Sequence, residues 1–316
     1  MSFSSSFLKP ILSPFSKGKL SILIYHRVHA QSDPIFPAEV DAKQFSLQLA
    51  WIKSLFNVIP LDEAVEALSK DQLPARAASI TFDDGYADNA EVALPVLKQH
   101  ALNATFFICT GYLDGGRMWN DTIIESVRRA RGTVLDLTAL TFGKHSISDM
   151  RERRSTIFNL IRQLKYLPLE TRQEKVDQIK NAIGQALPDN LMLRSEQVRE
   201  MHMTGMTIGA HTVTHPILAR IDGNKARQEI KDGKEKLQAI LDKPVSLFAY
   251  PNGKPGEDYL PEHVKIVKEL GFKAAVSTAW GTSSKTSDIF QLSRFTPWDQ
   301  TQLRFSLRLI KNCISS

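Results

Sequence analysis

The sequence is poor in cysteine, with only Cys109 and Cys313 among its 316 residues. Two cysteines without a C-x-x-C spacing exclude a disulfide framework and argue against a thiolate metal site. Cys109 falls in the apolar run 104–109, so we expect a buried small side chain there.

Long apolar runs are also absent. No stretch approaches the roughly 20 residues of a membrane-spanning helix. Near the N-terminus, Lys9, Pro10, Pro14 and Lys17 interrupt the run of about 7–15 apolar residues that a secretory signal requires. We therefore expect a cytoplasmic protein. Hydrophobic residues make up 42% and charged residues 23% of the chain, which excludes a disordered polypeptide.

Positive charge is only moderately in excess. The net charge is +6, it is spread along the chain, and no nucleic-acid motif accompanies it, so we predict no nucleic-acid partner. Residues 301–316 mix leucines with Arg304, Arg308 and Lys311. We interpret them as a basic tail helix that packs on its own domain, with contact at the inner face of a membrane as the alternative. The sequence leaves the oligomeric state open.

Apolar strand-like runs alternate with helix-like segments over most of the chain, which predicts an α/β fold with parallel strands. The expected strands are 20–25, 78–82, 104–109, 206–210, 245–250 and 274–277, and the expected helices are 44–55, 61–68, 89–100, 226–241 and 263–270. We predict an N-terminal arm at 1–19, a catalytic domain at 20–300 and the tail helix at 301–316. Residues 112–195 break the rhythm and are predicted to form a mostly helical insertion, with helices at 151–167 and 171–186.

Three polar stretches begin where an expected strand ends: Asp83-Asp84-Gly85, His211 to His215, and Tyr250-Pro-Asn-Gly253. The carboxyl ends of parallel strands form the ligand-binding face of such folds. Two histidines four residues apart share a face if that turn is helical, and a carboxylate would complete a three-ligand metal site. Adjacent aspartates on an extended chain point in opposite directions, so one can bind a metal while the other faces a substrate. Taken alone, each stretch also fits an ordinary turn or surface histidines.

Together, Thr81-Phe-Asp-Asp-Gly-Tyr86 and Gly209-Ala-His-Thr-Val-Thr-His-Pro216 resemble the NodB-type polysaccharide deacetylases, carbohydrate esterase family 4. The resemblance extends over roughly 20–294, apart from the insertion. It implies a distorted, incomplete (β/α) TIM-like barrel and a metal-dependent hydrolase that removes N-acetyl groups from a carbohydrate and releases acetate. It also implies that Asp83 is the general base and that Asp84, His211 and His215 hold a divalent metal. Zinc is the first expectation, and cobalt, nickel or iron(II) also suit these ligands.

The chain departs from the family pattern at two points. Ala249 stands where many members carry an arginine that orients the base, and Asn252 stands where they carry a tyrosine, although its backbone N–H can still complete an oxyanion hole. We predict that Arg294 replaces the missing arginine, a surface salt bridge being the alternative. No histidine follows His263 to serve as general acid. However, Ile24-Tyr-His-Arg-Val28 resembles the N-terminal Tyr-His motif of the poly-N-acetylglucosamine deacetylases, in which the order of motifs is permuted, and this implies His26 as the acid.

For substrate binding we predict Asn252, Tyr250, Trp119 and Trp298, where a core position is the alternative for each of the two tryptophans. The expected substrate is an amino-sugar polysaccharide, an oligosaccharide or a lipid-linked or nucleotide-linked glycan precursor. The missing export signal favours a precursor. Two other functions stay open: a deformylase or small cyclic-amide hydrolase on the same fold, and an inactive glycan-binding protein, which the Ala249 departure alone supports.

Overall fold

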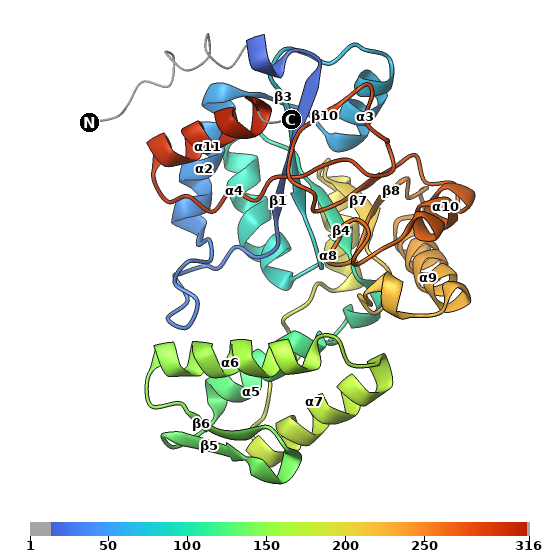
Figure 1. The fold of residues 1–316 in the computed structure, drawn as a ribbon. Coiled ribbons are helices and arrows are strands. Elements are labelled where there is room, and N and C mark those ends of the chain that lie inside the picture. Colours follow the sequence, from blue (N-terminus) through green and yellow to red (C-terminus); the bar gives the residue numbers. More distant parts are fainter. Residues whose placement is uncertain (1–13, 315–316) are drawn as a thin grey trace.

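A curved, mostly parallel sheet forms the centre of the computed structural model, which describes residues 14–314 (Figure 1). The parallel strands follow the order β1-β3-β4-β7-β8-β9. Their bounds are β1 Lys19–Tyr25, β3 Ala77–Phe82, β4 Thr105–Ile108, β7 Thr207–Ala210, β8 Leu247–Ala249 and β9 Ala274–Val276. A short strand β2 (Asn57–Val58) pairs with β3, and β10 (Ser283–Ser284) pairs antiparallel with β1.

Residues 289–295 bridge the two edges of this sheet. Leu292 pairs with Val276 of β9, and Phe295 pairs with Leu23 of β1. The N–H of Phe295 donates to the carbonyl of Ile22 at 2.8 Å, and the N–H of Ile24 donates to the carbonyl of Phe295 at 2.9 Å. The sheet is thereby almost closed by an irregular segment, so the predicted distorted, incomplete (β/α) barrel is confirmed.

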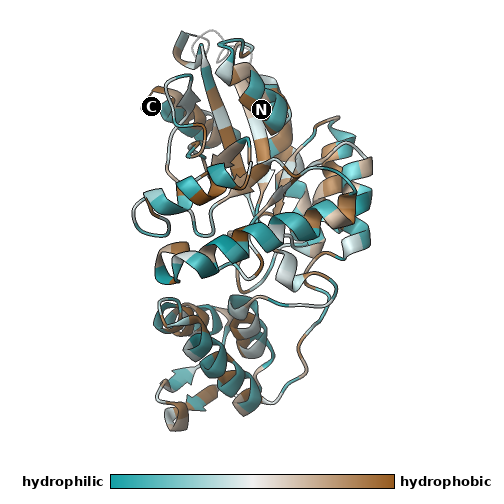
Figure 2. Cartoon of the chain, turned by 90° about the vertical axis from the view of Figure 1, so that its right-hand side faces the viewer, coloured by the Kyte–Doolittle hydropathy of each residue, from teal (hydrophilic) through white to brown (hydrophobic). Residues whose placement is uncertain are grey.

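The strands are buried on both faces, as expected for parallel strands covered by helices. Leu23 and Tyr25 of β1 belong to the apolar cluster shared with the surrounding helices. Leu20 and Ile22, on the alternate positions, belong to a second cluster with Phe107 of β4 and Leu247 of β8, which fills the interior of the barrel. Figure 2 shows the apolar strands enclosed by helices with hydrophilic outer faces.

The helices cover the barrel in sequence order: α2 (Ala42–Leu55), α3 (Leu61–Ser69), α4 (Leu94–Gln99), α8 (Ser195–Met203), α9 (Gly223–Leu241), α10 (Pro261–Glu269) and α11 (Gln302–Ile314). Aspartates begin two of them: Asp41 accepts from the N–H of Gln44, and Asp222 accepts from the N–H of Asn224. One expected helix, 89–100, is two elements, the π-helical turn η2 (Asn89–Ala93) followed by α4. Pro95, which lacks an N–H, lies in the first turn of α4 and interrupts the regular hydrogen-bond pattern.

The tail helix α11 packs on α2. Phe305, Leu309 and Cys313 are buried, and the ring of Phe305 lies 5.3 Å from that of Trp51. Leu303 and Leu307 remain exposed on its outer side. None of the helices within residues 14–314 is long and apolar enough to cross a membrane.

The insertion forms a lobe beside the barrel (Figures 1 and 2). It contains α5 (Trp119–Arg129), α6 (Met150–Leu164), α7 (Leu169–Ile183) and a hairpin that the sequence analysis did not predict, β5 (Val134–Leu137) with β6 (Gly143–Ser146). The lobe has its own apolar cluster, which also takes in Ile35 from the loop after β1. In the same loop, Asp33 pairs with Arg128 at 2.6 Å. The loop therefore ties the lobe to the end of β1.

Gly233 allows α9 to approach the backbone after β7. A Cβ atom at this position would lie 2.9 Å from both the carbonyl carbon and the oxygen of Thr212. We expect Gly233→Ala to lower the free energy of unfolding by about 1–3 kcal/mol, because backbone atoms cannot move aside as a flexible side chain can. Urea denaturation followed by circular dichroism measures this.

Gly223→Ala on the same helix is the matched control, because nothing lies within 4 Å of its Cβ position. Equal stability of the two variants would contradict the close packing of α9 on this backbone.

Candidate active site

Asp83 and Asp84 lie directly after β3, at the carboxyl end of the barrel. The N–H of Asp83 donates to the carbonyl of Tyr25 at 3.0 Å, which continues the pairing of β3 with β1. Asp84 then turns the chain with a φ of 75°, and Gly85 follows with a φ of 85°. Because Asp84 is not extended, both carboxylates reach the same site, and the expected opposite orientation of the two aspartates is wrong.

The two histidines come together through a loop and not through a helix. Thr212 has a φ of 68° and His215 a φ of 52°, both in the left-handed region, so the turn is not helical and the histidines do not meet on a helical face. The imidazole rings meet edge to face with centroids 4.8 Å apart. Glu229 of α9 holds this loop, since its carboxylate accepts from the N–H groups of Val213 and Thr214 at 2.9 and 2.8 Å.

Three donor atoms converge in a manner that fits a metal ion. The Nε2 atoms of His211 and His215 each lie 3.5 Å from Oδ1 of Asp84. This is too long for an ordinary N–H···O bond. It matches the separation of about 3.4 Å between ligands that a tetrahedral ion holds at about 2.0–2.2 Å. Nδ1 of His211 donates to the carbonyl of Ala249 at 2.7 Å, which leaves its Nε2 free to bind a cation.

The ionisation of these groups also favours cation binding. Burial would raise the pKa of Asp84, but the neighbouring imidazoles of His211 and His215 hold it well below its usual value. Burial lowers the pKa of His215 to about 4, so that its ring is neutral near pH 7. Burial also opposes the charged form of His211, yet Asp83 and Asp84 raise its pKa. A divalent ion would therefore displace a proton from His211, and its binding should weaken as the pH falls.

Cys109 lies beside this cluster. A carboxylate oxygen of Asp84, the sulfur of Cys109 and a ring nitrogen of His211 all lie within 4.8 Å of one another. However, burial and the neighbouring carboxylates raise the pKa of the Cys109 thiol well above its usual value. Its Sγ donates to the carbonyl of His211 at 3.2 Å. A protonated thiol is a poor ligand, so His215 is the better third donor.

Arg294 contacts Asp83 through a buried bidentate pair. Its Nη1 and Nη2 atoms each lie 2.7 Å from one oxygen of that carboxylate. Nε of Arg294 donates to the carbonyl of Ser277 at 2.8 Å, and Nη1 also contacts Oγ1 of Thr81 at 3.3 Å. Arg294 is 1% exposed, so the alternative of a surface salt bridge is wrong. Burial would raise the pKa of Asp83, but Arg294 and His211 lower it.

His26 lies at the end of β1 and is exposed, with its ring near the carboxylates of Asp83 and Asp84. Nδ2 of Asn89, in the π-helical turn, donates to the backbone carbonyl of His26 at 2.8 Å. His29, in the loop that follows, pairs with Glu39 at 2.5 Å.

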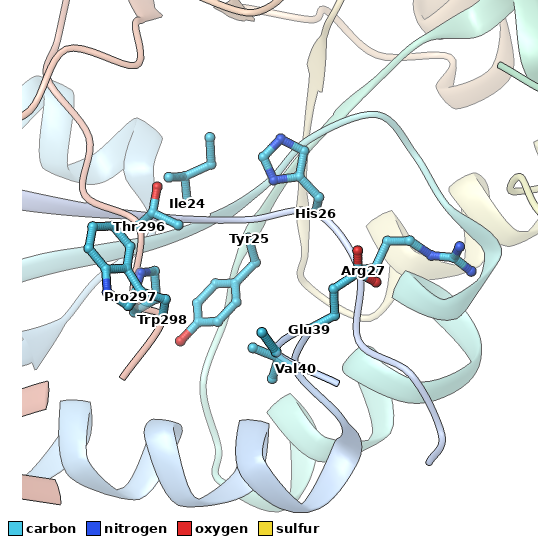
Figure 3. A pocket seen from close by; sticks show the side chains of 10 residues that line it. Ile24, Tyr25, His26, Arg27, Glu39, Val40, Thr296, Pro297 and Trp298 are labelled. Atoms are coloured by element: carbon cyan, nitrogen blue, oxygen red, sulfur yellow. The ribbon is translucent and has the colours of Figure 1, made fainter. Parts of the chain in front are cut away.

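Two of the cavities near the cluster are lined by predicted substrate contacts. The first, of about 250 Å³, lies between the end of β1 and residues 296–298, and Figure 3 shows His26 on one side of it and Trp298 on the other. The second, of about 200 Å³, lies between the barrel and the insertion and is lined by Asp84, His215, Asn252 and Trp119, among others.

Of the four predicted substrate contacts, Trp298, Trp119 and Asn252 line these cavities. Tyr250 does not. It is fully buried, its ring stacks on Tyr259 with centroids 3.8 Å apart, and its hydroxyl donates to the carbonyl of Phe290 at 3.1 Å. Its core position removes Tyr250 from substrate contact, so this prediction is wrong.

Sequence reasoning missed three residues around the site. Glu229 holds the histidine loop, Arg172 of α7 lines the second cavity, and Asp121 of α5 lies near Asp84. Burial raises the pKa of Asp121 to about 7, and the charge of Asp84 adds to this effect. All three lie in charged helices where the sequence gives no signal to separate them from solvent-facing neighbours.

Known proteins share both the sequence pattern and the fold. A family profile described as polysaccharide deacetylase matches residues 70–275. YxkH of Bacillus subtilis (strain 168), named as a polysaccharide deacetylase, is 22% identical over 279 residues, covering 88% of this chain and 71% of YxkH. The poly-β-1,6-N-acetyl-D-glucosamine N-deacetylase of Staphylococcus aureus (strain MSSA476) is 33% identical over 112 residues, or 31% of this chain. The match spans 39% of that enzyme's length.

Among solved structures, the deacetylase PplD of Streptococcus pyogenes in complex with acetate superposes with a TM-score of 0.62. It is 22% identical in sequence, and the superposition covers 93% of this chain and 98% of PplD. At this identity the likeness supports the fold alone, and it agrees with the barrel described above.

We expect Glu229→Gln to weaken metal binding by about 10–100-fold, because the amide offers one acceptor oxygen in place of two and His215 is then less firmly placed. Competition with a chromogenic chelator measures the dissociation constant. Glu235→Gln is the control, since Glu235 is exposed on the same helix. Unchanged affinity in Glu229→Gln would show that the loop holds its shape without this carboxylate.

We expect Arg294→Gln to destabilise the fold by about 3–5 kcal/mol, because it leaves the buried Asp83 carboxylate unpaired. The pKa of Asp83 is lowered in the folded state, so its contribution to stability is present above its unfolded value of about 3.9 and is lost as the pH falls. Without Arg294, burial should raise this pKa and move the acid limb of any pH–rate profile to higher pH.

Lys285→Gln is the control for Arg294→Gln, since its pair with Asp71 is exposed and should contribute less than about 1 kcal/mol. Denaturation at several pH values compares the two. An Arg294→Gln protein as stable as Lys285→Gln at pH 7 would argue against a structural dependence of Asp83 on Arg294.

Proposed function

Because the chain belongs to the polysaccharide deacetylase family, we propose that it is a metal-dependent carbohydrate N-deacetylase that releases acetate from an amino sugar. The observation that carries this proposal is the convergence of Asp84, His211 and His215 beside an ionised Asp83. Oδ2 of Asp83 lies 3.9 Å from Nε2 of His211. The predicted base is therefore next to the three predicted metal ligands, and it is not needed as a fourth ligand.

Asp84, His211 and His215 would hold the divalent ion, zinc being the first expectation from two imidazoles and a carboxylate. When bound, such an ion polarises the substrate carbonyl and lowers the pKa of water. Asp83 accepts the proton of the attacking water, and Arg294 keeps its carboxylate ionised and oriented. Asn252 lines the second cavity, and its backbone N–H would donate to the developing oxyanion. His26, at the rim, would protonate the leaving amine.

The substrate we propose is a glycan that contains N-acetylglucosamine. The relative from Staphylococcus aureus is named for deacetylation of such a polymer. The exposed His26 after Tyr25, at the end of the first strand, supports placement in the subgroup with an N-terminal Tyr-His motif. A lipid-linked or nucleotide-linked precursor remains our preferred form of this substrate, and the exposed Leu303 and Leu307 on the basic helix α11 would suit contact with a membrane surface. The cytoplasmic location stays a prediction.

The comparisons give no support to a deformylase, a cyclic-amide hydrolase or an inactive glycan-binding protein. The inactive alternative depended on Ala249 alone. Arg294 occupies the position beside Asp83 that the missing arginine was expected to fill.

We expect Asp83→Asn to lower acetate release by at least about 100-fold while metal content is retained, since the amide cannot accept the proton of water. Acetate released from N-acetylglucosamine oligomers and from lipid-linked precursors is measured with an enzyme-coupled assay, and formate is measured in parallel.

Asp62→Asn is the control, because Asp62 begins α3, outside the residues that line the two cavities beside the cluster. Full activity in Asp83→Asn would remove Asp83 as the base. Formate in place of acetate would move the assignment to the deformylase alternative.

A further inference from the structure

The second cavity, between barrel and insertion, holds a cationic group that the proposed reaction does not use. Arg172, in the first turn of α7, lines it together with Lys165, Asn120 and Trp119. Asp84, His215 and Asn252 line the same cavity. A group bound beside Arg172 is therefore bound in the space where the substrate meets the predicted metal ligands.

The guanidinium of Arg172 has no oxyanion partner. Among residues 14–314, two arginine residues are buried, Arg172 at 6% exposure and Arg294 at 1%. Arg294 forms four polar contacts, including the bidentate pair with Asp83. Within the described chain, Arg172 has neither a hydrogen bond from its guanidinium nor a carboxylate partner, and burial lowers its pKa.

The guanidinium of Arg172 lies over an aromatic ring, with its carbon 4.7 Å from the centroid of the Trp119 ring. A cation–π contact of this kind is weaker than a pair of charge-assisted hydrogen bonds to an oxyanion. The contact does hold the flat group in place with its N–H donors unused. An unpaired charge of this kind is typical of a binding site.

We propose that Arg172, with Lys165 at the rim, binds an oxyanion group carried by the glycan substrate, either a phosphate or a carboxylate. A guanidinium can donate two parallel hydrogen bonds to either group, and Lys165 adds a second positive charge. This inference rests on the proposed function, and it deepens it by naming the class of substrate. The insertion thus selects a charged amino sugar over a neutral one.

The test is a calorimetric titration of the full chain with three probes: N-acetylglucosamine 1-phosphate, N-acetylmuramic acid and N-acetylglucosamine. Metal-loaded and chelator-treated protein are both titrated, because a phosphate that binds only to the metal requires the metal and does not respond to Arg172. We expect at least one anionic probe to bind about tenfold or more tightly than the neutral sugar. Comparison of N-acetylglucosamine 1-phosphate with N-acetylmuramic acid shows whether the site prefers a phosphate or a carboxylate.

Arg172→Gln should abolish that preference, and Lys165→Gln should reduce it by a smaller factor. Arg162→Gln is the matched control, since Arg162 lies exposed on α6 and contacts only Asn159. Because loss of the Trp119 contact could unfold the lobe, Arg172→Lys serves as a second variant, which keeps the charge and loses the paired donors. The inference is overturned if Arg172→Gln keeps the wild-type preference, or if wild type shows none.

Acetate release separates this inference from the proposed function. An anion preference that depends on Arg172, without acetate release from any probe, would overturn the deacetylase proposal and leave the oxyanion site standing. The opposite result is acetate release from neutral oligomers and from the charged probes at equal kcat/KM, with no change in Arg172→Gln. It would overturn the oxyanion site and leave the deacetylase proposal standing.

Discussion

The buried pair between Arg294 and Asp83 is the interaction on which the rest of the site depends. Removing both charges from water costs several kcal/mol for each ion, and only good geometry with further hydrogen bonds offsets it. Here the pair is bidentate, and the carbonyl of Ser277 and the hydroxyl of Thr81 accept from two further N–H groups of Arg294. Arg294 belongs to the segment that bridges β9 and β1. The placement of the base is therefore linked to closure of the barrel.

The site is also a place where unfavourable backbone conformations gather. Asp84, Thr212, His215 and Asn252 all have positive φ angles. Each such residue costs roughly 1–3 kcal/mol and persists only where its surroundings hold it. Glu229 holds the histidine loop from α9, and Thr278 donates to the carbonyl of Asn252 at 2.8 Å. Helices and loops outside the barrel thus fix side chains that would otherwise relax away from one another.

The sequence was sufficient to predict the barrel, because its parallel strands are short apolar runs with polar residues at their ends. It was also sufficient to name Asp83, Asp84, His211 and His215 as one group, which the structure brings together. It was not sufficient to predict the backbone path through these four residues. The left-handed turns at Asp84 and Thr212 are set by tertiary contacts, and an extended strand or a helix was the better local expectation at each.

The insertion was less accessible to prediction for a related reason. The hairpin of β5 and β6 has alternating burial, with Leu135 and Leu137 inside, but only four residues per strand, which is too short a pattern to recognise. Arg172 lies in a helix where nearly every position is charged or polar, and only the packing of α7 against α5 shows that it is buried. Burial of a charged side chain results from the packing of the whole lobe, so it cannot be predicted from the local sequence.

Ala249 and Arg294 show that the proposed reaction requires a guanidinium beside the Asp83 carboxylate, and that its place in the sequence can vary. Ala249 is fully buried in the interior cluster of the barrel, and its carbonyl accepts from His211. A long side chain at this position would enter the cluster that contains Phe107, over whose ring the Arg294 guanidinium lies. The small residue and the distant arginine are therefore two parts of one arrangement. Restoring an arginine at 249 without removing Arg294 would place two cations beside a single carboxylate.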